Sequence, residues 1–399
     1  MSRLAEHVVS EDELAARLAE GRPLRVKLGV DPTARDITLG WAVPLRKLRA
    51  FQNHGHTAVL IMGDFTARIG DPSGKSETRP QLTPEKVKAF AAACVDQLLD
   101  ILSEDNLEVR YNSEWLESMK LSDILKLTSN ATVAQMLERE DFSQRYEAHE
   151  PISMIELMYP LLQGYDSVAV QADVELGGTD QLFNLLVARH LQRAYGQRPQ
   201  IAMTMPLLVG LDGVNKMSQS LGNYVAIRER AVEMFGKLMS VPDELVADYA
   251  SLATNLSDDA VAQISAAARA GGPQAGQAKR AMARSIVELY HGLDEAATAE
   301  ELFDLQFKDH EAPPDIPEAA LPDGSVRGEV VSLPAALSDL GLAASRGEVR
   351  RLIKGRGVRL NGEVVDGEEI PLQEVVGSVL QVGKRRFVRI AGPPPLRLT

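Results

Sequence analysis

The chain has 399 residues, which exceeds one ordinary domain and predicts two or three. Hydrophobic residues make up 45% and charged residues 25%, which is typical of a soluble globular protein and excludes a disordered or collagen-like chain. No apolar run is long enough to cross a membrane and the first residues are acidic, so we expect neither a membrane anchor nor a signal peptide. The one cysteine, Cys94, excludes a disulfide framework and a cysteine metal cage, and it favours a reducing cytoplasm without a bound metal.

The net charge of −13 excludes a protein that binds polyanions over its whole surface, but the charge is unevenly spread. Residues 345–390 carry ten Lys and Arg against six Asp and Glu. A basic segment on an acidic body indicates one domain that does chemistry and another that meets phosphates.

The first half of the chain alternates short apolar runs with helical patterns. We expect buried strands at 24–30 and 58–62, and further strands at 107–111, 168–172 and 201–205. Ser10 and Thr83 are expected to begin helices, and Gly55 to end the helix that contains Leu45, Leu48 and Phe51. Strands that alternate with helices predict an α/β fold, with a mostly parallel sheet between helices and a site at the carboxyl ends of its strands.

The second half changes character. From about 229 to 307 the pattern is helical, and a proline-rich linker follows. The basic module after it predicts helices at 333–340 and 346–354, then short strands joined by a turn at Asn361 and Gly362. We therefore expect a catalytic domain over 1–228, a helical domain over 229–311, a linker over 312–330 and a basic α+β module over 331–399.

Several segments could bind phosphate. The glycines at 70 and 74 are separated by three residues where a P-loop needs four, so the residues alone favour a strand-to-helix turn there. His54 and His56 lack partners at metal spacing and indicate a solvated helix end. More informative are the turn at 28–33, which precedes a helix beginning at 38–41, and the loop at 209–223, with three glycines around Lys216.

At this point the sequence resembles a known family, the bacterial tyrosyl-tRNA synthetases among the class I aminoacyl-tRNA synthetases. The resemblance covers nearly the whole chain, and six segments carry it: VDPT at 30–33, IGDPSGK at 69–75, YNSEW at 111–115, TVAQML at 132–137, YPLLQGYD at 159–166 and GGTDQ at 177–181. The basic module is similar to the S4 RNA-binding fold. The resemblance implies a Rossmann-type catalytic domain with a helical insertion that forms a homodimer interface, then an α-helical domain and the S4 module.

The resemblance also implies the reaction and its participants. L-tyrosine and ATP, with Mg²⁺ as part of the substrate, give tyrosyl-adenylate, and the tyrosyl group then passes to tRNA(Tyr); no cofactor is bound permanently. Adenylate formation is an in-line substitution at phosphorus, so the protein contributes positioning and charge.

The same resemblance assigns roles to residues of this chain. Asp166 is expected to accept a hydrogen bond from the substrate phenol. The alternative is a purely structural role for Asp166, as a helix cap or a surface acid. The remaining expected positions are Tyr159, Gln163 and Asp71 for the ammonium group; Asp31, Thr33 and Gln181 for the carboxylate and nucleotide; Asp180 for the ribose; Lys216, Ser218 and Gln219 for the nucleotide; Lys75 and Arg79 near the pyrophosphate; Thr38, Gly40, Trp41 and Ser220 within the two catalytic signatures; and Arg346, Arg350, Arg351 and Lys354 for RNA.

The catalytic signatures depart from the family pattern at three positions. His-Ile/Leu-Gly-His stands here as TLGW at 38–41, and Lys-Met-Ser-Lys-Ser stands as KMSQS at 216–220. Thr38 still offers a hydroxyl, whereas Trp41 has one N–H donor and Gln219 has no charge. Loss of one charge-assisted contact in such a site costs roughly 2–4 kcal/mol, or about 10²–10³ in rate. In one branch of the family a tyrosine before Gly29 also meets the phenol, but Lys27 and Leu28 stand here, so Asp166 acts more alone.

Three alternatives stay open at this point. The chain could be a paralogue that binds tyrosine, nucleotide or RNA without efficient activation, but an intact tyrosine pocket together with an S4 module favours the active enzyme. It could be a pure RNA-binding protein that uses the four basic residues, which lie at helical spacing. Tryptophan is the third alternative, as a rival substrate, and Asp166 argues against it.

Overall fold

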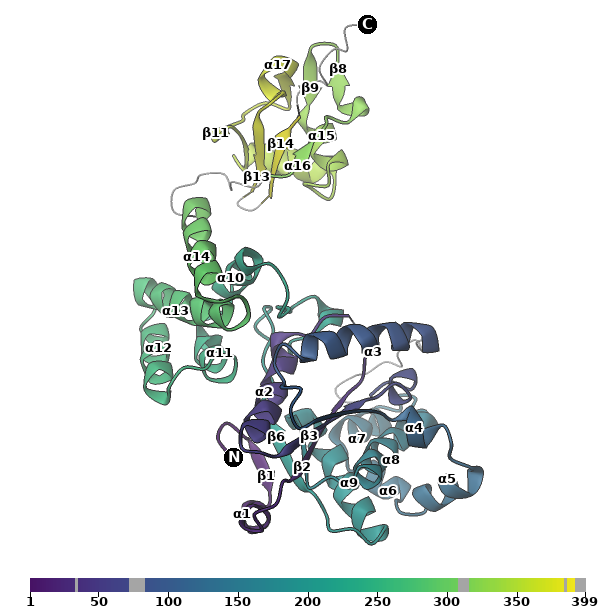
Figure 1. Ribbon diagram of the computed structural model, residues 1–399. Helices are drawn as coiled ribbons and strands as arrows, with labels where there is room; N and C mark the ends of the chain where they lie inside the picture. The colour runs from purple at the N-terminus through teal and green to yellow at the C-terminus, as the bar shows by residue number, and fades with distance from the viewer. Residues whose placement is uncertain (33–34, 72–82, 308–315, 384–385, 392–399) are drawn as a thin grey trace, which may run out of the picture. The chain divides into compact units, whose positions relative to one another are not determined.

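The computed structural model describes the chain except for residues 33–34, 72–82, 308–315, 384–385 and 392–399. It divides into two compact units, Met1–Ala296 and Ala297–Thr399, and most of their helices and many of their strands are labelled in Figure 1. Among the described residues, no helix combines the length and the apolar character that crossing a membrane requires.

A six-stranded sheet in the order β1-β6-β5-β2-β3-β4 forms the core of the first unit. All of its neighbouring strands are parallel except β1, which runs antiparallel to β6. The strands are β1 (His7–Val9), β2 (Arg25–Val30), β3 (Thr57–Met62), β4 (Leu107–Tyr111), β5 (Val174–Gly178) and β6 (Ile201–Met205). The chain moves outward from β2 to β4 and then returns to β5 on the other side of β2, so a crevice opens at the carboxyl ends of β2 and β5.

Helices connect the parallel strands and lie on both faces of the sheet (Figure 1). The longer connecting helices are α2 (Leu39–Asn53), α3 (Pro84–Leu98), α8 (Met154–Ala169) and α9 (Leu182–Ala194), while α1 (Glu11–Ala19) precedes β2. Four short helices are inserted between β4 and α8: α4 (Ser113–Leu116), α5 (Leu121–Thr128), α6 (Val133–Met136) and α7 (Glu140–Glu147). The layered α/β architecture predicted from the sequence is confirmed.

The described residues from 229 to 307 contain helices and no strand, as the sequence predicted. They are α10 (Ala231–Met239), α11 (Val246–Leu252), α12 (Asp258–Ala270), α13 (Gly272–His291) and α14 (Leu293–Phe307). Most of this segment belongs to the first compact unit, so no boundary between units falls at residue 228.

The local predictions can be compared with these elements one by one. Ser10 and Thr83 cap α1 and α3 by accepting hydrogen bonds from Glu13 N and Lys86 N, and Gly55 adopts a φ of 81° just after α2, as predicted. The strand expected at 168–172 is wrong, because this apolar run forms the last turn of α8 and the bend after it. Short apolar runs do not distinguish a buried strand from a buried helix end.

After the end of α14, which spans the boundary at residues 296 and 297, the described residues of the second unit form two small sheets and two principal helices. Its strands are β7 (Glu318–Ala319), β8 (Val326–Arg327), β9 (Val330–Ser332), β10 (Val358–Leu360), β11 (Glu363–Val364), β12 (Glu369–Pro371), β13 (Val379–Val382) and β14 (Arg386–Ile390). The helices are α15 (Leu333–Asp339), α16 (Arg346–Lys354) and the short α17 (Leu372–Val375). The segment expected to be linker therefore includes β7 and β8, because two-residue strands leave no periodic pattern in the sequence.

Candidate active site

A cavity of about 830 Å³ opens at the crevice between the carboxyl ends of β2 and β5. Its walls come from the ends of β2, β3 and β5, the start of α2, one face of α8 and the loop at 209–223. Ligands of open α/β sheets bind at such a reversal of strand order. The cavity thus gathers most of the positions that the sequence assigned to tyrosine and nucleotide.

Helix α8 presents three polar side chains to this cavity. Tyr159, Gln163 and Asp166 all line it and lie at i, i+4 and i+7, so they follow one helix face over about 10 Å. The helix packs closely against α9, since a Cβ on Gly164 would lie 2.8 Å from a methyl carbon of Leu191 and 3.1 Å from the Ala188 Cα. This packing fixes where the polar face of α8 stands.

Asp166 is a buried carboxylate with only 3% of its surface exposed. Trp115 Nε1 donates to Oδ1 at 2.8 Å, and Asn112 Nδ2 donates to Oδ2 at 3.3 Å. Burial raises the pKa of Asp166 to about 6, against the opposing influence of Lys27 and of these two hydrogen bonds. The side chain is neither a surface acid nor a helix cap, since Ser153 caps α8.

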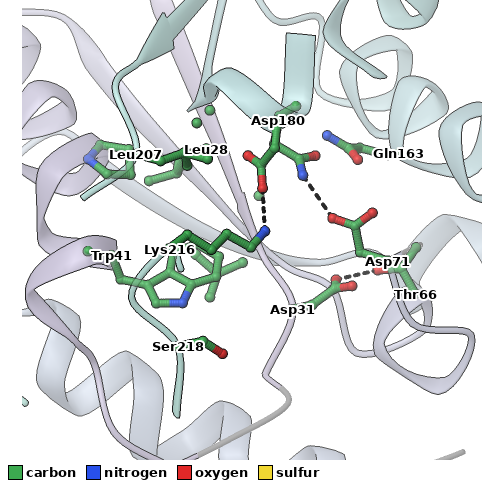
Figure 2. A pocket seen from close by; sticks show the side chains of 18 of the residues that line it. Leu28, Asp31, Trp41, Thr66, Asp71, Gln163, Asp180, Leu207, Lys216 and Ser218 are labelled. Atoms are coloured by element: carbon green, nitrogen blue, oxygen red, sulfur yellow. Dashed lines mark hydrogen bonds and ion pairs between the residues drawn. The ribbon is translucent and has the colours of Figure 1, made fainter. Parts of the chain in front are cut away.

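A second acidic cluster lies along the same wall. Tyr159 OH and Thr66 Oγ1 donate to the two oxygens of Asp31 at 2.8 and 2.7 Å. Asp71 accepts from Gln181 Nε2 at 2.8 Å, and Figure 2 shows Asp71 close to the Asp31 and Thr66 pair. Burial, with the nearby charges of Asp71 and Asp166, raises the pKa of Asp31 to about 7. Two carboxylates of reduced hydration, close to one phenol, form an environment that favours a cation.

The end of β3 reaches this cluster only because residue 63 has no side chain. A Cβ on Gly63 would lie 1.9 Å from Asp31 Oδ1 and 2.4 Å from Thr66 Oγ1. No other residue type fits at this point without moving the Asp31 carboxylate.

The other end of the cavity is formed by the loop at 209–223. Lys216 Nζ pairs with Asp180 Oδ2 at 2.6 Å, an ion pair drawn in Figure 2, and the Ser218 and Ser220 hydroxyls lie 2.9 Å apart. Gln219 donates from its side-chain amide to the carbonyl of Asp36. The loop therefore holds one lysine, two hydroxyls and one amide toward the cavity.

The loop is closed by its own polar side chains. Asp212 Oδ1 accepts from Val214 N and Asn215 N, each at 3.1 Å, and its Oδ2 accepts from Asn223 Nδ2 at 3.0 Å. The Asn215 side-chain amide also donates to Oδ2 at 3.0 Å, and this bond, followed by the others, lowers the pKa of Asp212 to about 2. Gly210 is required here, because a Cβ would lie 2.3 Å from Asn223 Nδ2.

The start of α2 faces this loop. Thr38 caps the helix by accepting from Trp41 N at 3.3 Å, and Gly40 lies against Met217, whose Cβ would be 3.3 Å from a Cβ at position 40. The Trp41 side chain lines the cavity, with 36% of the residue exposed, beside Lys216 and Ser218 in Figure 2. An indole at this position adds a flat apolar surface to the wall rather than a charge.

The predicted site residues thus fall into three groups. The cavity gathers Asp31, Thr38, Gly40, Trp41, Asp71, Tyr159, Gln163, Asp166, Asp180, Gln181, Lys216, Ser218, Gln219 and Ser220. Thr33, Lys75 and Arg79 lie outside the described residues. Arg346, Arg350, Arg351 and Lys354 lie in the second unit, all exposed on α16, whose Val349 and Ile353 are buried.

Three residues that influence Asp166, by a hydrogen bond or by their charge, had no predicted role. Asn112 and Trp115 belong to the YNSEW segment that carried the resemblance, and Lys27 is fully buried within β2. The available signal for Lys27 was a single lysine inside an otherwise apolar strand. Among the described residues, no group of three His, Cys, Asp or Glu side chains is placed to hold a metal ion.

Comparison with known proteins agrees with this geometry. The model of the family described as tRNA synthetases class I (W and Y) matches residues 19–308, and that of the S4 domain matches 331–374. The C-terminally truncated mitochondrial tyrosyl-tRNA synthetase of Aspergillus nidulans superposes with a TM-score of 0.62 at 23% identity, over 76% of this chain and 91% of that chain. The tyrosyl-tRNA synthetase of Archaeoglobus fulgidus gives 0.59 at 23% identity, over 75% and 97%. The fold and site define a class I aminoacyl-tRNA synthetase.

Sequence relatives narrow this class. The tyrosine–tRNA ligase of Moorella thermoacetica is 48% identical, over 98% of this chain and 94% of the relative. That of Oleidesulfovibrio alaskensis is 50% identical, over 96% and 95%. The chain belongs to the family of bacterial tyrosine–tRNA ligases.

Proposed function

We propose that this protein activates L-tyrosine with ATP and transfers the tyrosyl group to the terminal ribose of tRNA(Tyr). The observation that carries the proposal is Asp166, a buried carboxylate that lines the cavity and is oriented by Trp115 and Asn112. A hydrogen bond to a charged acceptor contributes about 1.5–3 kcal/mol, and a phenol adds such a bond to Asp166 whereas a plain phenyl ring does not. This difference favours tyrosine over phenylalanine.

The α-amino end of tyrosine is assigned to the second acidic cluster. Asp71, Tyr159 and Gln163 are assigned to the ammonium group, and Asp31, bonded to Tyr159, adds a second carboxylate beside it. Gln181, which donates to Asp71, and Thr33 are assigned to the substrate carboxylate and nucleotide. Because Tyr159 and Asp166 stand about two helical turns apart, the amino acid lies along α8 with each polar end met.

The nucleotide is assigned to the end of the cavity at the loop. An oxygen of the tyrosine carboxylate attacks the α-phosphorus of ATP, pyrophosphate leaves, and no bond to the protein forms. In the ligand-free state Lys216 is neutralised by Asp180; on binding, Lys216 turns to the phosphates and Asp180 to the ribose hydroxyls. Mg²⁺ enters with ATP, and we propose no permanently bound cofactor.

The three signature positions that depart from the family, Thr38, Trp41 and Gln219, contribute less charge to this step. Trp41 supplies a surface against which the nucleotide packs, and Gln219 and Ser220 supply hydrogen bonds. Lys75 and Arg79 are assigned to the pyrophosphate with Lys216. We therefore propose an active enzyme whose activation step is slower than three additional charged side chains would allow.

The S4 domain is assigned to tRNA. On α16, Arg351 and Lys354 are exposed, Arg350 pairs with Glu368 at 3.0 Å, and Arg346 lies 3.8 Å from Asp339. These four residues form a basic face that suits a phosphate backbone, and its binding weakens as salt rises. We place the reaction in the cytoplasm, where tRNA and ATP meet.

A homodimer is proposed through the inserted helices. Their apolar side chains include Leu121 with 72% of its surface exposed, Leu125 with 61% and Val133 with 59%, and Met154, at the start of the following α8, is 72% exposed. Exposed apolar side chains grouped on one inserted segment mark an interface. Sedimentation of the wild type and of Leu121→Lys tests this, and identical masses would contradict it.

The deciding experiment is ATP–pyrophosphate exchange with tyrosine, tryptophan and phenylalanine in parallel, followed by charging of tRNA(Tyr). We expect exchange that depends on tyrosine, and charging of this tRNA. Tight tyrosine binding without detectable exchange would overturn the proposed activity and leave a binding protein. Exchange that depends on tryptophan would overturn the assignment of Asp166.

A further inference from the structure

Lys27 forms a buried ionic cluster directly behind the tyrosine pocket. Its side chain is fully buried, and its Nζ donates to Glu175 Oε1 at 2.8 Å, Ser167 Oγ at 2.8 Å and the Gln163 carbonyl at 3.0 Å. Lys27 and Glu175 are register partners on β2 and β5. All three N–H groups of the ammonium therefore have an acceptor, and two of these belong to α8.

The acceptors on α8 bracket the residues that face the substrate. Gln163 lines the cavity itself, and Ser167 directly follows Asp166 along the helix. Glu175 also accepts from Ser167 Oγ at 2.9 Å and from the Gln200 amide. The cluster thus anchors the stretch of α8 from 163 to 167 to the centre of the sheet.

Asp166 is surrounded by groups from every element that packs around it. Lys27 on β2 is the positive charge among them, Glu175 on β5 and Asp31 after β2 are negative, and Tyr159 on α8 is neutral. Trp115 and Asn112 donate to Asp166 directly. Burial raises the pKa of Asp166, and the charge of Lys27 is the largest influence in the opposite direction.

A buried ion pair is weak support for stability, because apolar residues of similar volume often serve as well. Its place behind Asp166 indicates another use. We infer that Lys27 is a positioning residue for tyrosine recognition: its ammonium fixes the segment of α8 that carries Asp166 and places a positive charge behind that carboxylate. This inference rests on the proposed function, since it assumes that Asp166 accepts the phenol.

The role of Lys27 can be tested by calorimetry on the full-length protein, which measures the affinities for tyrosine and phenylalanine between pH 5 and 8. Both amino acids carry the ammonium group, so their affinity ratio removes the titration of Asp31 and isolates Asp166. In the wild type we expect the ratio to fall as Asp166 takes up a proton, with a midpoint near pH 6. In Lys27→Met the midpoint rises by about one unit, which lowers the ratio about threefold at pH 6.5 and about tenfold at pH 5.

Variants that are expected to shift the pH midpoint in opposite directions distinguish an effect of charge from a loss of structure. Glu175→Gln removes a like charge and keeps Lys27, so its midpoint falls, while Lys27→Arg keeps the charge and stays near the wild type. Should Lys27→Met not fold, Lys27→Met/Glu175→Gln leaves no unpaired ion, and its midpoint still rises because the lysine acts more strongly. Variants that lower the ratio equally at every pH, with the midpoint unmoved, would overturn the inference. A wild type that binds no tyrosine would overturn the proposed function as well, so the two failures are distinguishable.

Discussion

The two ends of the cavity are built in different ways. The tyrosine end consists of buried groups on β2 and α8 that are already bonded to one another, whereas the nucleotide end consists of a loop and the first turn of α2. All three departures from the family signatures, Thr38, Trp41 and Gln219, lie at the nucleotide end. Recognition of one amino acid needs prearranged buried groups, while phosphate stabilisation can be shared among several side chains and tolerates substitution.

If the two ends of the cavity are independent, the largest loss of activity is expected from Lys216→Ala. Removal of this cation should lower the exchange rate by about 10²–10³ without changing tyrosine affinity, because Lys216 pairs with Asp180 and not with the tyrosine cluster. Exchange kinetics and calorimetry measure the two quantities. Loss of tyrosine binding in this variant would show that the two ends are not independent.

Asp166→Asn, in contrast to Lys216→Ala, should impair the recognition of tyrosine. We expect kcat/KM for tyrosine to fall by about 100-fold, with little change for phenylalanine, because the amide replaces a charged acceptor and faces two N–H donors. Glu108→Gln, which loses a charge paired with Arg25 outside the cavity, is the matched control and should leave kcat/KM unchanged.

Asp31→Asn should stabilise the ligand-free protein at alkaline pH. The pKa of Asp31 is raised to about 7, so between about pH 4 and pH 7 the folded state holds a proton that the unfolded state has lost. Its contribution to the free energy of unfolding therefore falls as pH rises through this window. Denaturant unfolding should show the variant more stable at pH 8 by on the order of 2 kcal/mol and nearly equal to the wild type at pH 4. A difference that does not depend on pH would contradict this reasoning.

Restoring the family signatures should raise activity at the nucleotide end alone. We expect Gln219→Lys, and separately Trp41→His, to increase the exchange rate by about tenfold, since each adds one hydrogen bond that is charged or better directed toward the phosphates. Tyrosine affinity serves as the control. If neither variant raises the rate, these positions are wrongly assigned.

The smallest effect is expected in the S4 domain. Arg351→Ala/Lys354→Ala removes two exposed cations and should lower tRNA charging severalfold at moderate salt, with ATP–pyrophosphate exchange unchanged. The double variant should also show a shallower dependence of charging on salt concentration. Equal loss of exchange and charging would argue against a role in tRNA binding.

Much of the fold could be predicted from the sequence, because buried parallel strands leave short β-branched runs. The predictions at 107–111 and 201–205 match β4 and β6 residue for residue. The strand predicted at 168–172 is wrong, since the buried last turn of α8 is as apolar as a strand. No strand was predicted at β5, because Glu175 interrupts its apolar pattern with a charge whose partner lies on β2.

The candidate site was predicted in part for a related reason. Motif residues that follow strands, or that share one face of a helix, are expected to meet at the crevice, and Asp31, Tyr159 and Asp166 do so. The bonds among them could not be predicted, because they depend on how α8 sits against the sheet. The Lys27 to Glu175 pair likewise depends on the register between two strands that are far apart in the chain.

The missing side chain at Gly63 limits how this cavity could be re-engineered. An enlarged or altered pocket for an unnatural amino acid would have to begin at apolar wall positions such as Leu28 and Leu176. Even one methyl group at residue 63 would press on the carboxylate of Asp31, which in our proposal lies beside the ammonium group that every α-amino acid carries. A mutant library should therefore leave that codon untouched, whatever side chain the new substrate carries.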